Sequence, residues 1–186
     1  LPAEDVSMSE NLARLPLLGL LGLLRRPATT AELARLLDRS PRQIAREIER
    51  WRRDGAIAEA SASGAGRAFV ASSTIEEHAQ QLPTRVRRRF HDLIARELLR
   101  RAPQPHDPAL LEAVRHCRQA GKRRSFLRHA FALAQHFKAT LQNRAALQLF
   151  AEIQEAIPPA NLARRIAVEL EAAELRTRVG ELDEGI

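Results

Sequence analysis

Residues 40–55, SPRQIAREIERWRRDG, contain the signals for both ends of a helix. Ser40 can cap the helix start, and Pro41 suits the first helical position, where a backbone N–H is not needed. Gly55 marks the end, because glycine readily takes the left-handed conformation that terminates helices. The spacing i, i+4, i+7 predicts a buried face made of Ile44, Ile48 and Trp51.

Two more helices are predicted before this one. The apolar run from Asn11 to about Arg25 suits a buried helix that Pro27 ends. The run LPLLGLLGLL within it is too short to span a bilayer. The next segment, TTAELARLLD, has a cap at Thr29 or Thr30, and Thr29 and Glu32 have the spacing of a capping box. Its inner face is predicted to consist of Leu33, Leu36 and Leu37.

The segment after Gly55 predicts a small β-hairpin. AIAEA and RAFVASS are short, partly alternating stretches on either side of the glycine-containing SASGAG. Helix, helix, turn, helix and hairpin follow one another in the order of a winged helix-turn-helix. We therefore expect residues 1–75 to form a winged helix-turn-helix domain whose wing is the hairpin.

From Thr74 onward the pattern is helical. Pro83 starts a long helix whose apolar face is predicted to be Val86, Phe90, Leu93, Ile94 and Leu98. The proline-rich PQPHDP, residues 103–108, predicts a hinge. Helices are then expected over 108–120, 123–137, 141–156 and 160–180, so the fold class is mainly α and residues 76–186 form a helical domain.

One of these helices carries a pattern that resembles a tetratricopeptide repeat. RAALQLFAEIQEAIPP has small, aromatic, apolar and proline residues where the second helix of such a repeat has them: Ala146, Phe150, Ile153 and Pro158. VGELDEGI near the end resembles the turn of a following repeat, with Gly180 in the turn and Gly185 in the place of Ala146. The interval between these two positions is longer than the usual period, so the array is expected to be degenerate and tetratricopeptide-like.

The whole chain resembles the segment that follows the nucleotide-binding module in bacterial STAND-type signalling ATPases. LPTRVRRRFHDLIARELL is similar to that family's LP…RRxxH pattern and supplies Leu82, Pro83, Arg87, Arg88 and His91. HCRQAGKRRSFLRHAFALAQHF is similar to the family's entry into its repeats, through His116, Ala120 and Gly121. Lys122 stands where the family often has aspartate.

This resemblance implies a regulatory segment of a larger signalling or transcription-regulating protein, truncated at both ends. In such proteins the winged helix serves as an intramolecular lever, and the repeats bind a partner. The sequence has no G-x-x-x-x-G-K-[ST] phosphate loop, so nucleotide hydrolysis would lie outside these residues.

The residues of this chain predict no enzyme, no cofactor and no metal site. The histidines at positions 78, 91, 106, 116, 129 and 136 are scattered and lack metal-ligand motifs. Cys117 is the only cysteine, which excludes an internal disulfide and fits a reducing compartment such as the cytoplasm. We expect no membrane contact.

Arginine supplies nearly all of the positive charge. The net charge is +7, and only Lys122 and Lys138 among the thirty basic residues are lysine. Phosphate binding explains such a balance, and so does a GC-rich genome. A second basic cluster comprises Arg85, Arg87, Arg88 and Arg89. It could extend a phosphate-binding surface, dock on an acidic partner domain, or simply be solvated.

The helix over 41–53 places four arginines about 160–240° from Ile44, on the side opposite its apolar face. That side faces the major groove in a helix-turn-helix that reads DNA. The candidate contact residues are Arg42, Gln43, Arg46, Arg50 and Arg53, with Arg67 in the wing. An arginine face is also ordinary for a solvated helix. We therefore expect other domains of the parent protein or a protein partner to be the binding partner, with duplex DNA as the alternative.

Overall fold

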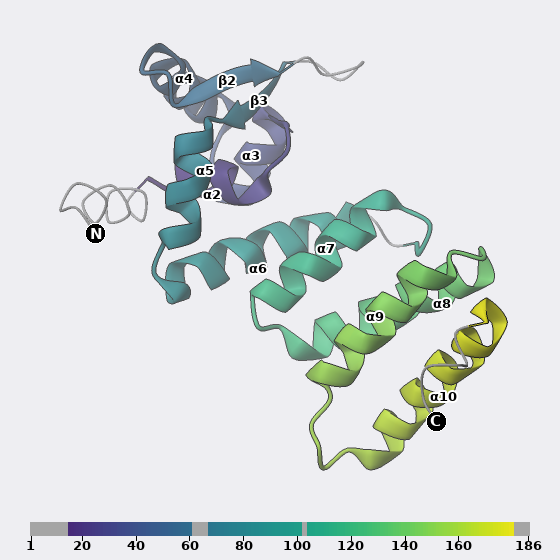
Figure 1. Ribbon diagram of the computed structural model, residues 1–186. Helices are drawn as coiled ribbons and strands as arrows, with labels where there is room; N and C mark the ends of the chain where they lie inside the picture. The colour runs from purple at the N-terminus through teal and green to yellow at the C-terminus, as the bar shows by residue number, and fades with distance from the viewer. Residues whose placement is uncertain (1–14, 61–66, 102–103, 181–186) are drawn as a thin grey trace. The chain divides into compact units, whose positions relative to one another are not determined.

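The computed structural model describes residues 15–60, 67–101 and 104–180. In this part the protein is mainly helical, with nine helices and one small antiparallel sheet (Figure 1). Contacts divide the chain into two compact units, Leu1–Glu97 and Leu98–Ile186. The predicted fold class is confirmed at this level. The predicted domain boundary between residues 75 and 76 stays a prediction.

Among the described residues, the first unit contains four complete helices and the larger part of a fifth. They are α2 Pro16–Leu24, α3 Thr30–Leu37, α4 Pro41–Arg53, α5 Ser73–Gln81 and α6 Thr84–Arg101. Its strands are β1 Ala28–Thr29, β2 Ile57–Ala60 and β3 Ala68–Ala71. The part of the predicted first helix that precedes residue 15 lies outside the described residues.

The helix starts follow the predicted capping signals. Thr29 accepts a hydrogen bond from the backbone N–H of Glu32 at 3.2 Å and so caps α3. Ser40 accepts from the N–H of Gln43, and the Gln43 side chain accepts from the N–H of Ser40 in return, which completes a capping box at α4. These bonds satisfy N–H groups that a helix leaves without partners in its first turn.

The sheet has the strand order β1-β3-β2, and both pairings are antiparallel. β2 and β3 are the two strands predicted to flank the hairpin turn, and they pair with Ala60 opposite Ala68. The turn itself, SASGAG, lies outside the described residues. β1 was not predicted: it is two residues long, too short to show an alternating pattern.

The core of the first unit surrounds α2. Every residue of this helix from Leu17 to Leu24 is buried. An apolar sequence with no polar face is the pattern of a helix covered on all sides, which explains why the run LPLLGLLGLL folds here. β3, α3 and α5 contact α2, and α4 contacts α3 and β2.

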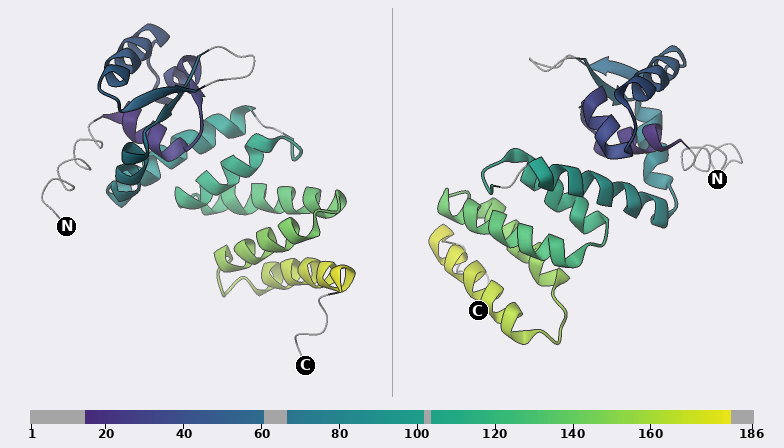
Figure 2. Two further views of the ribbon diagram at one scale, coloured as in Figure 1. Left: turned by 45° about the horizontal axis from the view of Figure 1, so that its top comes forward. Right: turned by 180° about the vertical axis from the view of Figure 1, so that it is seen from behind.

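The second unit is a series of antiparallel helices, each packed on its neighbour in sequence (Figures 1 and 2). The helices are α7 Pro108–Gln119, α8 Arg123–Ala139, α9 Asn143–Ala156 and α10 Leu162–Val179. They agree closely with the four predicted ranges. α6 ends at Arg101 and α7 begins at Pro108, so the proline-rich PQPHDP does separate two helices.

The repeat-like positions of α9 form part of this unit's core. Ala146, Phe150 and Ile153 are each fully buried, as their small, aromatic and apolar pattern predicts. The Phe131 ring on α8 meets the Phe150 ring edge to face, with ring centroids 6.0 Å apart. Gly180 adopts a left-handed conformation at the end of α10. Gly185 lies outside the described residues.

Candidate binding surface on helix α4

Helix α4 has one buried side and one charged side. Ile44 and Ile48 are almost completely buried, and they attach the helix to the rest of the unit. Trp51, predicted to belong to the same face, is only partly buried. The four arginines of the predicted DNA-facing side, Arg42, Arg46, Arg50 and Arg53, are all exposed. We call them the α4 arginine row.

The side chains of the α4 arginine row differ in the contacts that they make. The Arg50 guanidinium lies 5.1 Å from the centre of the Trp51 ring, at cation–π distance. Arg53 donates from Nε to the backbone carbonyl of Glu49 at 3.3 Å. Across the described ranges, no hydrogen bond or ion pair engages the side chains of Arg42 and Arg46. Two guanidinium groups, four residues apart on the same face, therefore remain available to an anionic partner.

Gln43 is exposed, but its side-chain oxygen is already in use. Oε1 accepts a hydrogen bond from the backbone N–H of Ser40 at 3.2 Å as half of the capping box. Recognition of adenine by glutamine needs both the oxygen and the nitrogen of the amide. In a bidentate contact with adenine, the Gln43 oxygen would therefore be shared between the base and the cap of α4.

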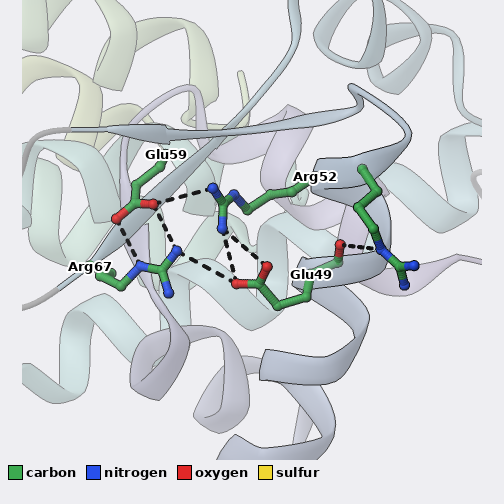
Figure 3. A network of polar contacts seen from close by, with 5 residues as sticks. Glu49, Arg52, Glu59 and Arg67 are labelled. Carbon is green, nitrogen blue, oxygen red and sulfur yellow. Dashed lines mark hydrogen bonds and ion pairs between the residues drawn. The ribbon is translucent and has the colours of Figure 1, made fainter.

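Arg67, the candidate contact residue of the wing, lies in a ring of alternating charges with Glu59, Arg52 and Glu49 (Figure 3). Arg67 donates from Nε and Nη2 to the two carboxylate oxygens of Glu59, each at 2.8 Å. Arg52 donates to Glu49 at 3.0 Å and lies 3.5 Å from Glu59. Arg67 closes the ring to Glu49 at 3.6 Å. We call these four residues the charge ring. The charge ring joins α4 to the β2–β3 pair, and its two positive and two negative charges sum to zero.

The same contacts shift the pKa values of the hairpin pair. The hydrogen bonds from Arg67 hold the pKa of the Glu59 carboxyl below its ordinary value. The reciprocal hydrogen bonds raise the pKa of Arg67. Both groups are exposed to solvent, so the arrangement fixes side-chain geometry more than it adds stability.

The second predicted cluster is spread around the start of α6. Arg85, Arg88 and Arg89 are exposed, whereas Arg87 is partly buried and donates to the backbone carbonyl of Gln80. Arg87 thus fixes the link between α5 and α6. The remaining three arginines are free to meet solvent or a partner.

Other side chains with potential chemistry lie in the interior or apart from one another. His91 and His116 are buried, and Cys117 is buried with its thiol 3.5 Å from the Ser125 hydroxyl. Within residues 15–60, 67–101 and 104–180, histidine, cysteine and carboxylate side chains form no group that could hold a metal ion. In the same ranges no helix has both the length and the apolar character needed to cross a bilayer.

Comparison with known proteins yields no match for this chain, whether against family models, curated proteins or solved structures. The function is therefore inferred from the surface chemistry of the chain itself.

The charge ring is the part of this surface that reasoning from the sequence missed. Glu59 pairs with Phe69 across the β2–β3 ladder, so Arg67 lies two residues from its direct partner. Such diagonal neighbours on one face are within reach of long side chains. The hairpin register would have identified the Glu59–Arg67 contact, but the register depends on where the turn begins.

Proposed function

We propose that this chain is a non-enzymatic regulatory segment of a larger cytoplasmic signalling or transcription-regulating protein. In this proposal the first unit is a winged helix that acts as an intramolecular lever. The second unit is a tetratricopeptide-like array that binds a protein partner. The observation that carries the proposal is the α4 arginine row, an exposed cationic face on a helix anchored firmly by Ile44 and Ile48.

Several features support the winged-helix interpretation. The elements follow the order α2, β1, α3, α4, β2, β3, with α4 capped at the position of a recognition helix. A short strand before α3 completes a three-stranded sheet with the hairpin. α4 packs on β2 and the charge ring bridges the two, so the hairpin and α4 would move together as a lever must.

The sequential packing of α7, α8, α9 and α10 supports the repeat interpretation of the second unit. In repeat arrays each helical pair contacts only its neighbours, and the extended surface serves protein recognition. The burial of Ala146, Phe150 and Ile153 is what a repeat helix requires.

An acidic protein surface explains the arginine row better than DNA does. A winged helix that grips DNA gains from a free cation in the wing, yet Arg67 is held by two carboxylates. Gln43 is likewise committed to the helix cap. Arg42 and Arg46 remain, and two exposed guanidinium groups suit carboxylates of a neighbouring domain as well as phosphates.

The regulatory role is tested by reversing charge on α4 in the full-length protein. Arg46→Glu combined with Arg50→Glu should release the lever and raise the signal-independent output of the effector domain. Arg124→Glu with Arg128→Glu is the matched control, because these two residues are also exposed and four apart on one helix, α8. Equal output from the two double variants would refute the lever.

Duplex DNA is the second candidate partner, favoured by the position of the arginines opposite the buried face of α4. If it is correct, affinity for a duplex should fall as salt rises, with a linear dependence of log K on log salt. Replacing Arg46 and Arg50 by alanine should then reduce the slope by about 2, one for each lost phosphate contact. A slope that is unchanged by both substitutions would exclude α4 as the contacting helix.

A further inference from the structure

A second surface of the first unit, separate from the α4 arginine row, has the properties of a docking site. α3 and α6 enclose a pocket of about 480 Å³. Its apolar lining includes Leu36, Leu37, Val86, Phe90 and Leu93. Phe90 and Leu36 are buried, whereas Leu37, Val86 and Leu93 are partly exposed. The α6 members recur at i, i+4 and i+7, so they form one continuous row along the pocket.

The helices around the pocket are fixed to each other. Arg35 on α3 donates from Nε to the Glu97 carboxylate of α6 at 2.7 Å, and Glu97 is largely buried. Because Glu97 is largely buried, its ion pair with Arg35 favours one arrangement of the two helices. The pocket is therefore preformed, which reduces the entropy that a ligand must lose on binding.

The rim of the pocket is basic. Three arginines and one aspartate line it: Arg39, Arg85, Arg89 and Asp38. Arg39 is paired with Glu47 at 2.6 Å. In the described part of the chain Arg85 and Arg89 have no ion pair, and both are exposed. They lie four residues apart, on the same side of α6, directly beside the apolar row.

We propose that this pocket binds an amphipathic helix of a protein partner whose apolar side chains are flanked by glutamate or aspartate. Apolar anchors at i, i+3 or i+4, and i+7 of such a helix would enter the pocket between α3 and α6. Carboxylates one turn apart would pair with Arg85 and Arg89, matching their spacing. A cationic or neutral helix would leave these arginines desolvated without a partner, which provides selectivity for the acidic one.

Fluorescence anisotropy with the full 186-residue chain tests this inference. The probe is a fluorescein-labelled 16-residue helical peptide of Leu, Ala and Glu, with leucines at i, i+4 and i+7. The matched probe has lysine in place of each glutamate. We expect the acidic peptide to bind and the lysine peptide to bind at least about tenfold more weakly.

Variants locate the binding surface. Arg85→Glu with Arg89→Glu should weaken binding of the acidic peptide at least about tenfold, and the milder Arg85→Gln with Arg89→Gln should fall between this variant and the wild type. Arg88→Glu is the control, because Arg88 is exposed on α6 but does not line the pocket. It should change the affinity by less than about twofold. Circular dichroism checks that each variant remains folded.

Three outcomes would overturn the inference. The first is equal affinity for the acidic and lysine peptides, or no binding of the acidic one. The second is equal weakening by the Arg88 control. The third is displacement of the peptide by duplex DNA from the wild type but not from the Arg85/Arg89 variant, which would assign the surface to nucleic acid. None of these results depends on the α4 arginines, so the pocket is tested separately from the proposed function.

Discussion

Gly22 shows how one residue determines the packing of the first unit. A Cβ atom at this position would lie 2.7 Å from the Ala79 Cβ and 2.8 Å from the backbone oxygen of Ile75, both on α5. The hydrogen side chain of glycine thus permits α2 and α5 to pack in close contact. Backbone atoms cannot rotate away as a flexible side chain can. A small adjustment of α5 therefore cannot make room for a Cβ atom at position 22.

Gly22→Ala is therefore predicted to destabilise the protein, although alanine is the better helix former. Helix propensity alone would favour alanine by about 1 kcal/mol. Overpacking against α5 should cost about 1–3 kcal/mol and outweigh it. Thermal unfolding followed by circular dichroism measures the balance. An increase in melting temperature would contradict the close packing of α2 and α5.

Lys138 provides a second prediction at this scale, one that depends on pH. Its ammonium group lies 2.8 Å from Glu171 and 2.5 Å from Glu174, and so joins α8 to α10. Hydrogen bonding to Lys138 lowers the pKa of both carboxyls, and the same bonds raise the pKa of Lys138. The contribution of these ion pairs to folding stability is complete above the ordinary carboxyl pKa of 4.5. It is lost as pH falls through the lowered pKa values of the two glutamates. At the alkaline end it is complete below the ordinary lysine value of 10.5 and is lost as pH rises through the raised pKa of Lys138.

Lys138→Met should consequently reduce the free energy of unfolding by about 0.5–1 kcal/mol at pH 7, since partly exposed pairs contribute little more. The difference from the wild type should be smaller near pH 3, below the ordinary carboxyl value of 4.5, because falling pH protonates the two glutamates and removes their ion pairs with Lys138. Denaturant titrations at the two pH values provide the measurement. A penalty that is the same at both would show that Lys138 acts through packing of its aliphatic stem.

Among the elements, α10 has two apolar faces with different roles. Val168, Ala172 and Leu175 are buried against the rest of the second unit. On the opposite side Leu162, Ile166 and Leu170 are exposed, each by more than half of its surface. The same helix therefore offers an internal comparison of buried and exposed leucine.

Leu175→Ala is predicted to cost about 2–4 kcal/mol, because it removes fully buried methyl groups and leaves a cavity. Leu170→Ala should change stability by less than about 0.5 kcal/mol, because Leu170 is 66% exposed. Chemical denaturation of the two variants tests the assignment of the faces. Similar costs for both would mean that the outer face of α10 is covered in solution.

The elements also show which parts of the fold can be predicted from sequence. The caps of α3 and α4 and the α7–α10 boundaries follow from local rules, since Thr29, Ser40, Pro41 and the turn residues act on the chain next to them. β1 could not be predicted, because two residues become a strand only by pairing with β3. The charge ring depends on the register between β2 and β3, and the α3–α6 pocket depends on tertiary packing. The charge ring leaves no periodic pattern in the sequence. The spacing of Val86, Phe90 and Leu93 does predict an apolar face of α6, but it does not show that packing against α3 leaves part of that face open.

In the molecule as a whole, each unit pairs some of its surface charges and leaves others exposed. The second unit pairs many of its charges between helices, as Arg118 does with Glu152 and Glu155 and Lys138 with Glu171 and Glu174. The first unit retains exposed arginines without ion pairs within the described residues, Arg42 and Arg46 on α4 and Arg85 and Arg89 on α6. Part of the net charge of +7 is therefore available for recognition. The arginine row of α4 is the centre of the proposed function.

Solvent access to the α4 arginine row in the full-length protein tests that function most directly. Arg46→Cys provides a thiol on the row, and Arg88→Cys provides an exposed reference on α6. The native Cys117 is buried and should contribute little background. In the unstimulated full-length protein, maleimide should label position 46 at least about tenfold more slowly than position 88, because the lever would bury the row against another domain. Equal labelling rates at the two positions would contradict the account.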